Sequence, residues 1–168
     1  MSQTEELESH ELKEGDHAPD FELPISGGEG EEGSFKLSDA LGTSVILYFY
    51  PKDDTPGCTT EACEFRDNMD VLSETGALVY GISPDSVKSH DKFIAKHDLN
   101  FPLLADEGAK VATMYGVWKE KNMYGRKYMG VERTTFLINP DGTIGKIWHK
   151  VKPKGHAEEV LKTISEIR

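Results

Sequence analysis

Apolar residues follow two periods along this chain, one typical of buried strands and one typical of amphipathic helices. The clearest strand run spans residues 45–50, which are aromatic, β-branched or leucine, and Pro51 ends it. Residues 56–73 then repeat apolar positions every three or four residues, which predicts a helix with one buried face. The same patterns predict further strands at 78–83, 134–139 and 144–151, and further helices at 85–97, 109–114 and 157–167.

The order of the main elements, β-α-β-α-β-β-α, is that of a thioredoxin-like fold. It implies an α/β architecture in which a mixed central sheet carries helices on both faces. Ahead of these elements, residues 21–24 and 35–37 flank a glycine- and glutamate-rich loop at 27–33 and predict a short hairpin. With 168 residues, the chain is expected to form a single domain over 1–168.

Charge is distributed unevenly along the chain. The net charge is −11, and residues 1–40 hold 12 acidic and 2 basic side chains, which leaves 18 acidic and 17 basic ones in the rest. We expect residues 1–11 to be a solvated, frayed acidic tail. Because no basic stripe is present, nucleic acid is not an expected partner. The sequence shows neither a membrane-spanning run nor a secretory or transit signal, so we expect no membrane association and a cytoplasmic location.

Two cysteines, Cys58 and Cys63, carry the most specific signal. Their C-x4-C spacing differs from the C-x2-C of zinc ribbons and of thioredoxin-type reductases. Two thiols do not fill a four-ligand zinc site, and the six histidines are scattered away from the pair. We therefore expect neither a metal site nor another cofactor.

Cys58 is predicted to lie in the first turn of the helix at 56–73. Thr55 followed by Pro56 is a good helix start, with a hydroxyl N-cap and a proline at the first helical position. The positive helix end favours a thiolate. An ordinary cysteine, with a pKa of ~8.5, is only about 3% ionised at neutral pH. Lowering that pKa by ~2 units requires ~2.7 kcal/mol, and a helix end supplies ~1 kcal/mol, so a cation is also needed.

Few residues can supply this cation, because the chain has only four arginines. Arg66 lies eight residues beyond Cys58 on the same helix, Arg126 is in a glycine-flanked segment expected to be exposed, and Arg168 is the last residue. Arg133 leads into the strand at 134–139, where ligand groups converge in open α/β sheets. We predict that Arg133 faces Cys58. The alternative is that it pairs with Glu132 or a helix carboxylate.

Cys63 cannot bond to Cys58 while both lie on an intact helix. Residues five apart are ~140° around the axis and ~7.5 Å along it, which places their Cα atoms ~8.6 Å apart. A disulfide spans at most about 7 Å between Cα atoms. If Cys63 resolves an oxidised Cys58, the turn between them must unwind, and Thr59-Thr60-Glu61 is weakly helical by propensity. The alternative is that Cys63 is an inert buried thiol.

Pro51, Thr55 and Cys58 match P-x-x-x-T-x-x-C, the active-site signature of peroxiredoxins. The longer string FYPKDDTPGCTTEACEFRD resembles the PrxQ subfamily, also called bacterioferritin comigratory proteins. Agreement continues through GISPDSVKSHDKF, FPLLAD, YGVW and GVERTTFLINPDG, and so covers residues 12–162. The resemblance does not extend to the acidic first eleven residues.

This resemblance implies a thiol peroxidase with a thioredoxin-like fold and a peroxiredoxin-type N-terminal extension. It implies Cys58 as the peroxidatic cysteine and Cys63 as the resolving one, with an intramolecular disulfide between them. Thr55 and Arg133 would then donate hydrogen bonds to thiolate and peroxide, and Pro51 would shield the site. Hydrogen peroxide and organic hydroperoxides are the expected substrates, a thioredoxin-like dithiol is the expected reductant, and we expect a monomer.

Two other functions are compatible with a reactive thiol on this fold. A thiol–disulfide oxidoreductase would exchange with protein disulfides, although the missing C-x2-C argues against it. A redox-gated binding protein would expose a surface when oxidation melts the helix.

Other conspicuous residues have less specific interpretations. His90 and His97 are expected to pack at the boundary of the core. Trp118, Met123 and Tyr124 are expected to pack ordinarily, with a peroxide entrance or an interface as the alternative. The run at 119–121 is expected to be solvated surface.

Overall fold

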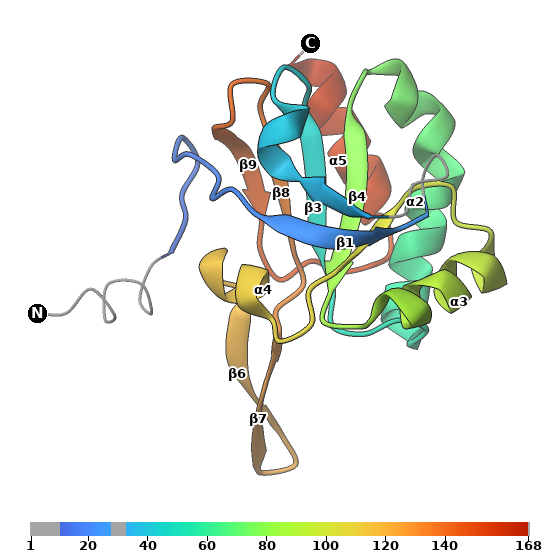
Figure 1. Ribbon diagram of the computed structural model, residues 1–168, viewed down its shortest axis with the longest axis vertical. Helices are drawn as coiled ribbons and strands as arrows, with labels where there is room; N and C mark the ends of the chain where they lie inside the picture. Colours follow the sequence, from blue (N-terminus) through green and yellow to red (C-terminus); the bar gives the residue numbers. More distant parts are fainter. Residues whose placement is uncertain (1–10, 28–32, 168) are drawn as a thin grey trace, which may run out of the picture.

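A seven-stranded mixed sheet forms the centre of the molecule, with strands in the order β2-β1-β5-β4-β3-β8-β9 (Figure 1). The computed structural model describes residues 11–27 and 33–167. The predicted acidic tail at 1–11 therefore lies outside the described residues except for Glu11, and the loop at 27–33 is described only at its two ends. The sheet strands are β1 (Glu22–Ser26), β2 (Ser34–Lys36), β3 (Val45–Phe49), β4 (Leu78–Ser83), β5 (Leu103–Ala105), β8 (Thr134–Ile138) and β9 (Ile144–Trp148).

Strand pairing in this sheet combines parallel and antiparallel ladders. Strand β3 pairs in parallel with β4 and antiparallel with β8, and β4 pairs in parallel with β5. All five residues of β3 are buried, as expected for a central strand covered on both faces. The carboxyl ends of β3, β4 and β5 consequently meet at one edge of the sheet, which is where ligand groups gather in open α/β folds.

Helices cover both faces of the sheet, as predicted. One buried cluster joins the sheet to α2 (Pro56–Glu74), α3 (Val87–His97) and α5 (His156–Glu166). The other joins the opposite face to the short helix α4 (Lys110–Met114), the 3-10 helix η1 (Leu37–Ala40) and the β1–β2 hairpin. These two cores hold the strand ends rigidly on both sides.

The predicted helices and strands agree closely with the observed ones, although the short 3-10 helix η1 and the strands named below were not predicted. Residues 21–24 and 35–37 form the expected hairpin, although their strands are shifted by one or two residues. The sequence patterns missed β5, which has only three residues. They also missed the two-stranded sheet of β6 (Trp118–Met123) and β7 (Arg126–Val131), because both strands are largely polar.

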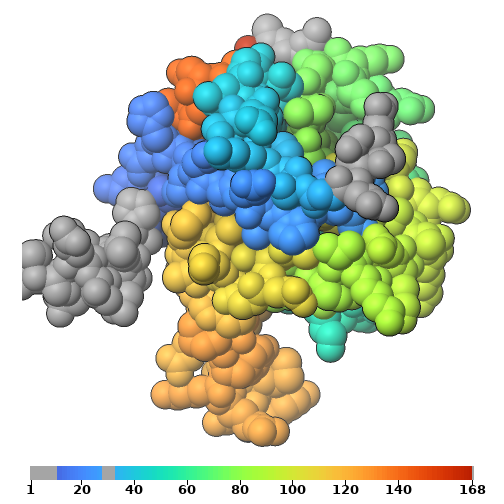
Figure 2. All heavy atoms as spheres, viewed as in Figure 1, coloured from blue at the N-terminus to red at the C-terminus, as the bar shows by residue number. Residues whose placement is uncertain are grey.

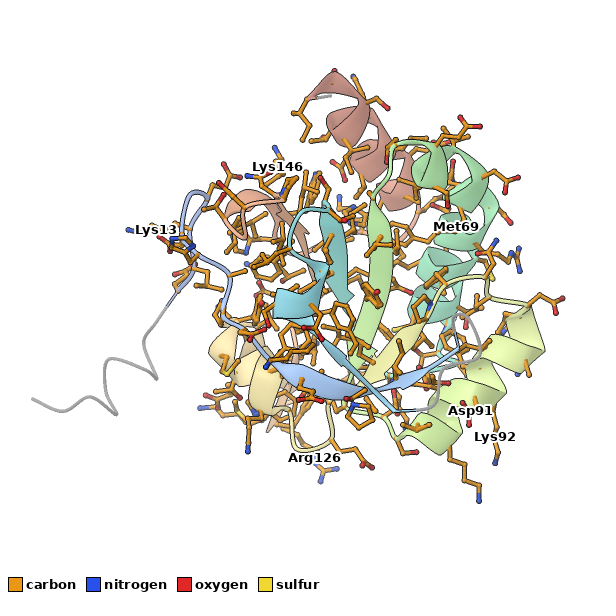
Figure 3. All side chains as sticks on the ribbon, turned by 45° about the horizontal axis from the view of Figure 1, so that its top comes forward. Lys13, Met69, Asp91, Lys92, Arg126 and Lys146 are labelled. Atoms are coloured by element: carbon orange, nitrogen blue, oxygen red, sulfur yellow. The ribbon has the colours of Figure 1, made fainter. Side chains whose placement is uncertain are left out.

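The β6–β7 hairpin projects from the body of the molecule (Figure 2). The side chains of Met123 and Tyr124 near its tip are 54% and 97% exposed, so the expected ordinary packing is wrong for them. Trp118, at its base, is half-buried and packs against the core. Arg126 points outward from this hairpin, as the sequence predicted (Figure 3).

No helix among the described residues, 11–27 and 33–167, is both long and apolar enough to cross a membrane.

Candidate active site

Cys58 lies in the first turn of α2, directly after the loop that leaves the carboxyl end of β3. Pro56 is at the first helical position and Thr55 is the N-cap residue, with extended backbone angles. One expected detail is wrong, because the Thr55 hydroxyl does not cap the helix. It donates instead to the carbonyl oxygen of Lys52 at 2.9 Å and closes the loop on itself. The thiol of Cys58 is buried, with the residue 1% exposed.

Arg133 approaches this first turn from the start of β8. Its guanidinium lies beside Gly57, where an added β-carbon would sit 3.2 Å from Nη2. Glycine at this position therefore leaves the space that the arginine occupies. Burial acts to lower the pKa of Arg133, but the charges of Glu61 and Cys58 and hydrogen bonds to both raise it above its usual value. The guanidinium of Arg133 therefore lies beside the helix turn that carries Cys58.

The alternative partner of Arg133, a helix carboxylate, is also present. Nη1 of Arg133 donates to Oε1 of Glu61 at 2.7 Å. The side chain of Glu61 is fully buried and that of Arg133 is 16% exposed. A carboxylate in the turn after Cys58 would by itself disfavour a thiolate there. The carboxylate of Glu61 instead holds the guanidinium against the turn that carries Cys58.

Glu61 is an unusual carboxyl group because one of its oxygens is unsatisfied. Within the described residues, Oε2 of Glu61 and the hydroxyl of Tyr48 are buried side-chain atoms that make no hydrogen bond. Burial raises the pKa of Glu61 to about 7, although Arg133 opposes the shift. Burial also raises the pKa of Tyr48, and the charges of Glu61 and Cys58 add to that effect. The interior behind Cys58 is therefore apolar enough to favour neutral groups.

Cys63 lies one and a half turns further along α2 and is half-buried. Both cysteines are free thiols, and the helix between them is continuous. Among the described residues, two glutamates tie this part of α2 to other elements. Glu61 does so through its pair with Arg133, and Glu64 does so by accepting from the backbone amide of Gly155 at 2.7 Å.

The other predicted site residues occupy the loop between β3 and α2. Pro51 is half-buried at the start of that loop, before the turn that leads to Cys58. Arg66 does not face the cysteine, because it donates to Asp67 and to the carbonyl oxygen of His97. Lys121 on the β6–β7 hairpin interacts electrostatically with Arg133 and Cys58, and its pKa is lowered overall. Burial and Arg133 lower its pKa, whereas Glu132 and Cys58 raise it.

Sequence reasoning missed two features of this region. Glu61 was not singled out as the helix carboxylate that pairs with Arg133, although its position three residues after Cys58, on the buried side of the helix, could have revealed its role. His90 was expected at the core boundary, which is wrong. Its side chain is 0% exposed, Nδ1 lies 2.7 Å from Asp53, and Nε2 lies 2.9 Å from the Leu104 carbonyl oxygen.

Comparison with known proteins places this geometry in a family. The model of the AhpC/TSA family matches residues 14–147. Among curated proteins, peroxiredoxin Bcp of Bacillus subtilis is 50% identical over 153 residues, covering 91% of this chain and 95% of the relative. Peroxiredoxin Bcp of Escherichia coli is 44% identical over 155 residues, covering 92% and 97%.

Solved structures agree with these relatives. A cysteine-to-serine mutant of PrxQ from Xylella fastidiosa superposes with a TM-score of 0.86 at 42% identity, covering 95% of this chain and 98% of that one. Peroxiredoxin Q of Xanthomonas campestris gives a TM-score of 0.81 at 42% identity, with coverage of 87% and 90%. With its thioredoxin-like sheet and these relatives, the chain belongs to the AhpC/TSA family, as a peroxiredoxin of the Bcp, or PrxQ, type.

Proposed function

We propose that this peroxiredoxin reduces hydrogen peroxide and organic hydroperoxides through Cys58, and that Cys63 resolves the oxidised cysteine. The observation that carries the proposal is the position of Arg133, which Glu61 holds beside the buried first turn of α2. A solved structure of the Xanthomonas campestris bacterioferritin comigratory protein concerns its alkyl peroxide reduction activity. This likeness supports organic hydroperoxides as substrates of the present chain.

The first step transfers one oxygen atom to sulfur. The Cys58 thiolate attacks the peroxide oxygen farther from the organic group, the O–O bond breaks, and the sulfur becomes a sulfenic acid. The released alkoxide takes a proton and leaves as an alcohol, or as water when the substrate is hydrogen peroxide. Arg133 and the free N–H groups of the first helical turn stabilise the charge that develops on the leaving oxygen. In this proposal the Thr55 hydroxyl turns from Lys52 toward the peroxide, and Pro51 shields the thiolate from water.

The second step forms the disulfide and requires the helix to open. The Cys63 thiolate attacks the sulfur of the sulfenic acid, a Cys58–Cys63 bond forms, and water leaves. Because the two positions lie ~8.6 Å apart on an intact helix, the segment from Pro56 to Glu64 has to unwind first. Among the described residues, few polar contacts tie this segment to other elements, chiefly the Glu61–Arg133 and Glu64–Gly155 hydrogen bonds, which makes this opening feasible.

An external dithiol then returns the enzyme to its starting state. It attacks the disulfide, is itself oxidised, and leaves both cysteines as thiols, which balances the two electrons given to the peroxide. We infer that this reductant is thioredoxin or a protein like it, that the peroxidase works as a monomer, and that it acts in the reducing cytoplasm. Turnover with purified thioredoxin and its reductase, together with the mass of the protein in solution, tests the first two of these inferences.

The test of the proposed function is to add one equivalent of hydrogen peroxide to the reduced protein and to measure its mass and free thiols. The wild-type protein should rapidly lose both thiols and two hydrogens of mass. The variant Cys63→Ser should retain the fast first step and gain one oxygen or a sulfenic-acid adduct. The variant Cys58→Ser should react no faster than free cysteine. Wild-type thiols that react at the rate of free cysteine would favour disulfide exchange or oxidation-gated binding instead.

A further inference from the structure

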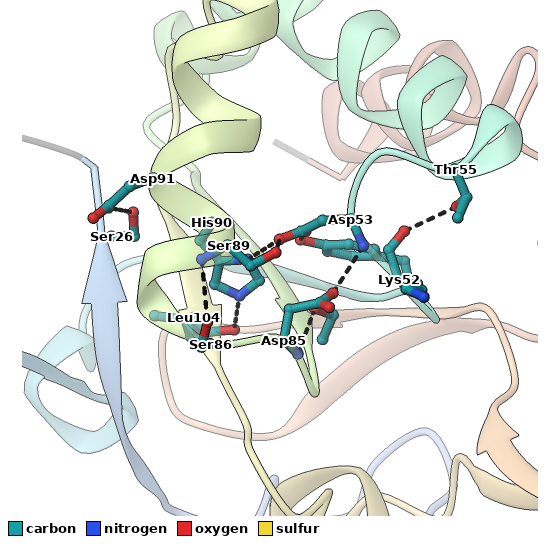
Figure 4. A network of polar contacts seen from close by, with 12 residues as sticks. Ser26, Lys52, Asp53, Thr55, Asp85, Ser86, Ser89, His90, Asp91 and Leu104 are labelled. Atoms are coloured by element: carbon teal, nitrogen blue, oxygen red, sulfur yellow. Dashed lines mark hydrogen bonds and ion pairs between the residues drawn. The ribbon is translucent and has the colours of Figure 1, made fainter.

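The loop that carries Pro51 and Thr55 is tied to helix α3 at two places. Asp53 contacts the first turn of α3, where the Ser89 hydroxyl donates to its Oδ2 at 2.7 Å and Nδ1 of His90 lies at 2.7 Å (Figure 4). The next residue, Asp54, contacts the last turn, where Lys96 Nζ lies at 2.8 Å. Two consecutive loop residues therefore contact opposite ends of one helix.

The inner of these two attachments is buried and fully bonded. The side chains of His90 and Asp53 are 0% and 5% exposed, whereas those of Lys96 and Asp54 are 61% and 43% exposed. The Tyr50 hydroxyl also donates to Asp53, at 2.6 Å. Since buried charge-assisted hydrogen bonds are stronger than solvated ion pairs, the inner attachment dominates.

His90 connects the loop to the interior of the sheet. The Leu104 carbonyl oxygen in β5 can only accept a hydrogen bond, so Nε2 of His90 donates to it at 2.9 Å while Nδ1 faces Asp53. The backbone amide of Asp53 donates to Asp85, which also accepts from the Ser83 hydroxyl at the end of β4. The ends of β3, β4 and β5 are thus joined through one loop residue. We call the side chains of Tyr50, Asp53, Ser89 and His90 the α3 clamp.

Asp53, Asp85 and His90 also bring potential metal-ligand atoms within 4.8 Å of one another. The hydrogen bonds just described already use these atoms and account for the cluster without an ion.

The loop that the α3 clamp holds is followed directly by the segment of α2 that must unwind for the disulfide to form. Asp54 is held in the left-handed region, at φ 60°, which is unfavourable for a residue other than glycine and requires surrounding contacts to maintain it. Thr55 is extended and bonded to Lys52, and α2 starts at the next residue. The backbone is therefore fixed through Thr55, whereas the segment after it must unwind.

We propose that His90 and Asp53 are positioning residues, and that the α3 clamp sets the boundary at which α2 unwinds. Given the function proposed for Cys58, the clamp holds Pro51 and Thr55 in place for the attack on peroxide. It also keeps them in place while Cys58 moves toward Cys63, so that the site reforms after reduction.

The test separates the two chemical steps in folded variants. His90→Phe removes both hydrogen bonds of the ring, Asp53→Asn removes the charge with little change in shape, and His90→Gln retains one donor. Lys96→Gln, at the exposed outer attachment, is the matched control. Sulfenic acid formation is timed in the Cys63→Ser background, and disulfide formation is timed in the chain with both cysteines.

We expect His90→Phe and Asp53→Asn to slow sulfenic acid formation about tenfold or more, because small misplacements of catalytic groups reduce rates strongly. Disulfide formation should keep its rate or become faster, and His90→Gln should recover part of the first step. Lys96→Gln should match the wild type. A purely structural role would lower the melting temperature while leaving both rates of the folded protein unchanged, and this result would overturn the proposal.

If His90→Phe does not fold, Ser89→Ala supplies the test. It removes one donor to Asp53 and leaves the buried ring in place, and we expect a selective loss of about threefold in the first step. Equal rates in Ser89→Ala and the wild type would then refute the positioning role. Slow oxidation of wild-type Cys58 would instead refute the proposed function itself, so the two failures are distinguishable.

Discussion

The loop at residues 51–55 and the first turns of α2 are adjacent in sequence but are held in opposite ways. The loop is anchored by buried hydrogen bonds to three neighbouring elements, chiefly through Asp53. The start of α2 keeps its place through the burial of Cys58 and Phe65 and through two polar contacts made by Glu61 and Glu64. A site that needs both fixed donors and a mobile thiol can be built by dividing these tasks between two consecutive segments.

The largest effect is expected from removing the cation that lies beside the first turn of α2 and pairs with Glu61. Arg133→Met should slow sulfenic acid formation by roughly 10²–10³, the usual loss when one charge-stabilising donor is deleted from an active site. Arg133→Lys should retain part of the rate because it keeps the charge but not the planar guanidinium. Stopped-flow oxidation in the Cys63→Ser background measures both. Arg126→Met, on the exposed hairpin, is the control, and an equal loss there would remove the argument for Arg133.

Glu61 should make the stability of the first turns of α2 depend on pH. Its pKa is raised to about 7 in the folded chain, from an ordinary value of 4.5, so the folded state binds this proton more tightly. The stabilisation is fully present below pH 4.5 and is lost as the pH rises through 7. The shift corresponds to about 3 kcal/mol in the free energy of unfolding.

Urea unfolding of the wild type and of Glu61→Gln between pH 4.5 and 8 tests this dependence. The wild type should lose stability relative to the variant as the pH rises. Parallel stability curves would show that Glu61 titrates normally and that the site is better solvated than its burial indicates.

The smallest effect concerns how easily α2 opens. Thr60 is exposed on the segment that must unwind, and alanine is a better helix former by ~0.6 kcal/mol. Thr60→Ala should therefore slow disulfide formation about threefold and leave sulfenic acid formation unchanged. Ser73→Ala, near the far end of the same helix, should change neither step. A slower second step in both variants would mean that the whole helix opens, rather than its first turns.

The elements predicted best from the sequence are those whose local pattern matches their tertiary environment. The apolar run at 45–50 became β3, and the helical repeat at 56–73 became α2, because both are buried on the faces that their periods indicate. The polar strands of the β6–β7 hairpin escaped prediction, since both of its faces are largely exposed and neither period is present. The three-residue strand β5 is too short to show any period.

The residues proposed for the active site also differ in how far the sequence could place them. Cys58 could be placed at a helix start because the preference of a proline such as Pro56 for the first helical position is local, although the Thr55 hydroxyl does not cap the helix. Arg133 was found by eliminating the other arginines. Its contact with Glu61 spans 72 positions in the sequence and depends on the packing of α2 against the sheet.

The sequence by itself determined the order of the main elements, the start of α2, the place of Cys58 in its first turn and the incompatibility of a Cys58–Cys63 disulfide with an intact helix. These properties depend on residues near one another in the chain. Only the tertiary structure decided that Glu61 is a buried partner of Arg133 and that His90 is a central contact of the active-site loop. Burial and hydrogen bonding of these side chains depend on distant segments, and the chemistry of a charged group changes when folding removes its water.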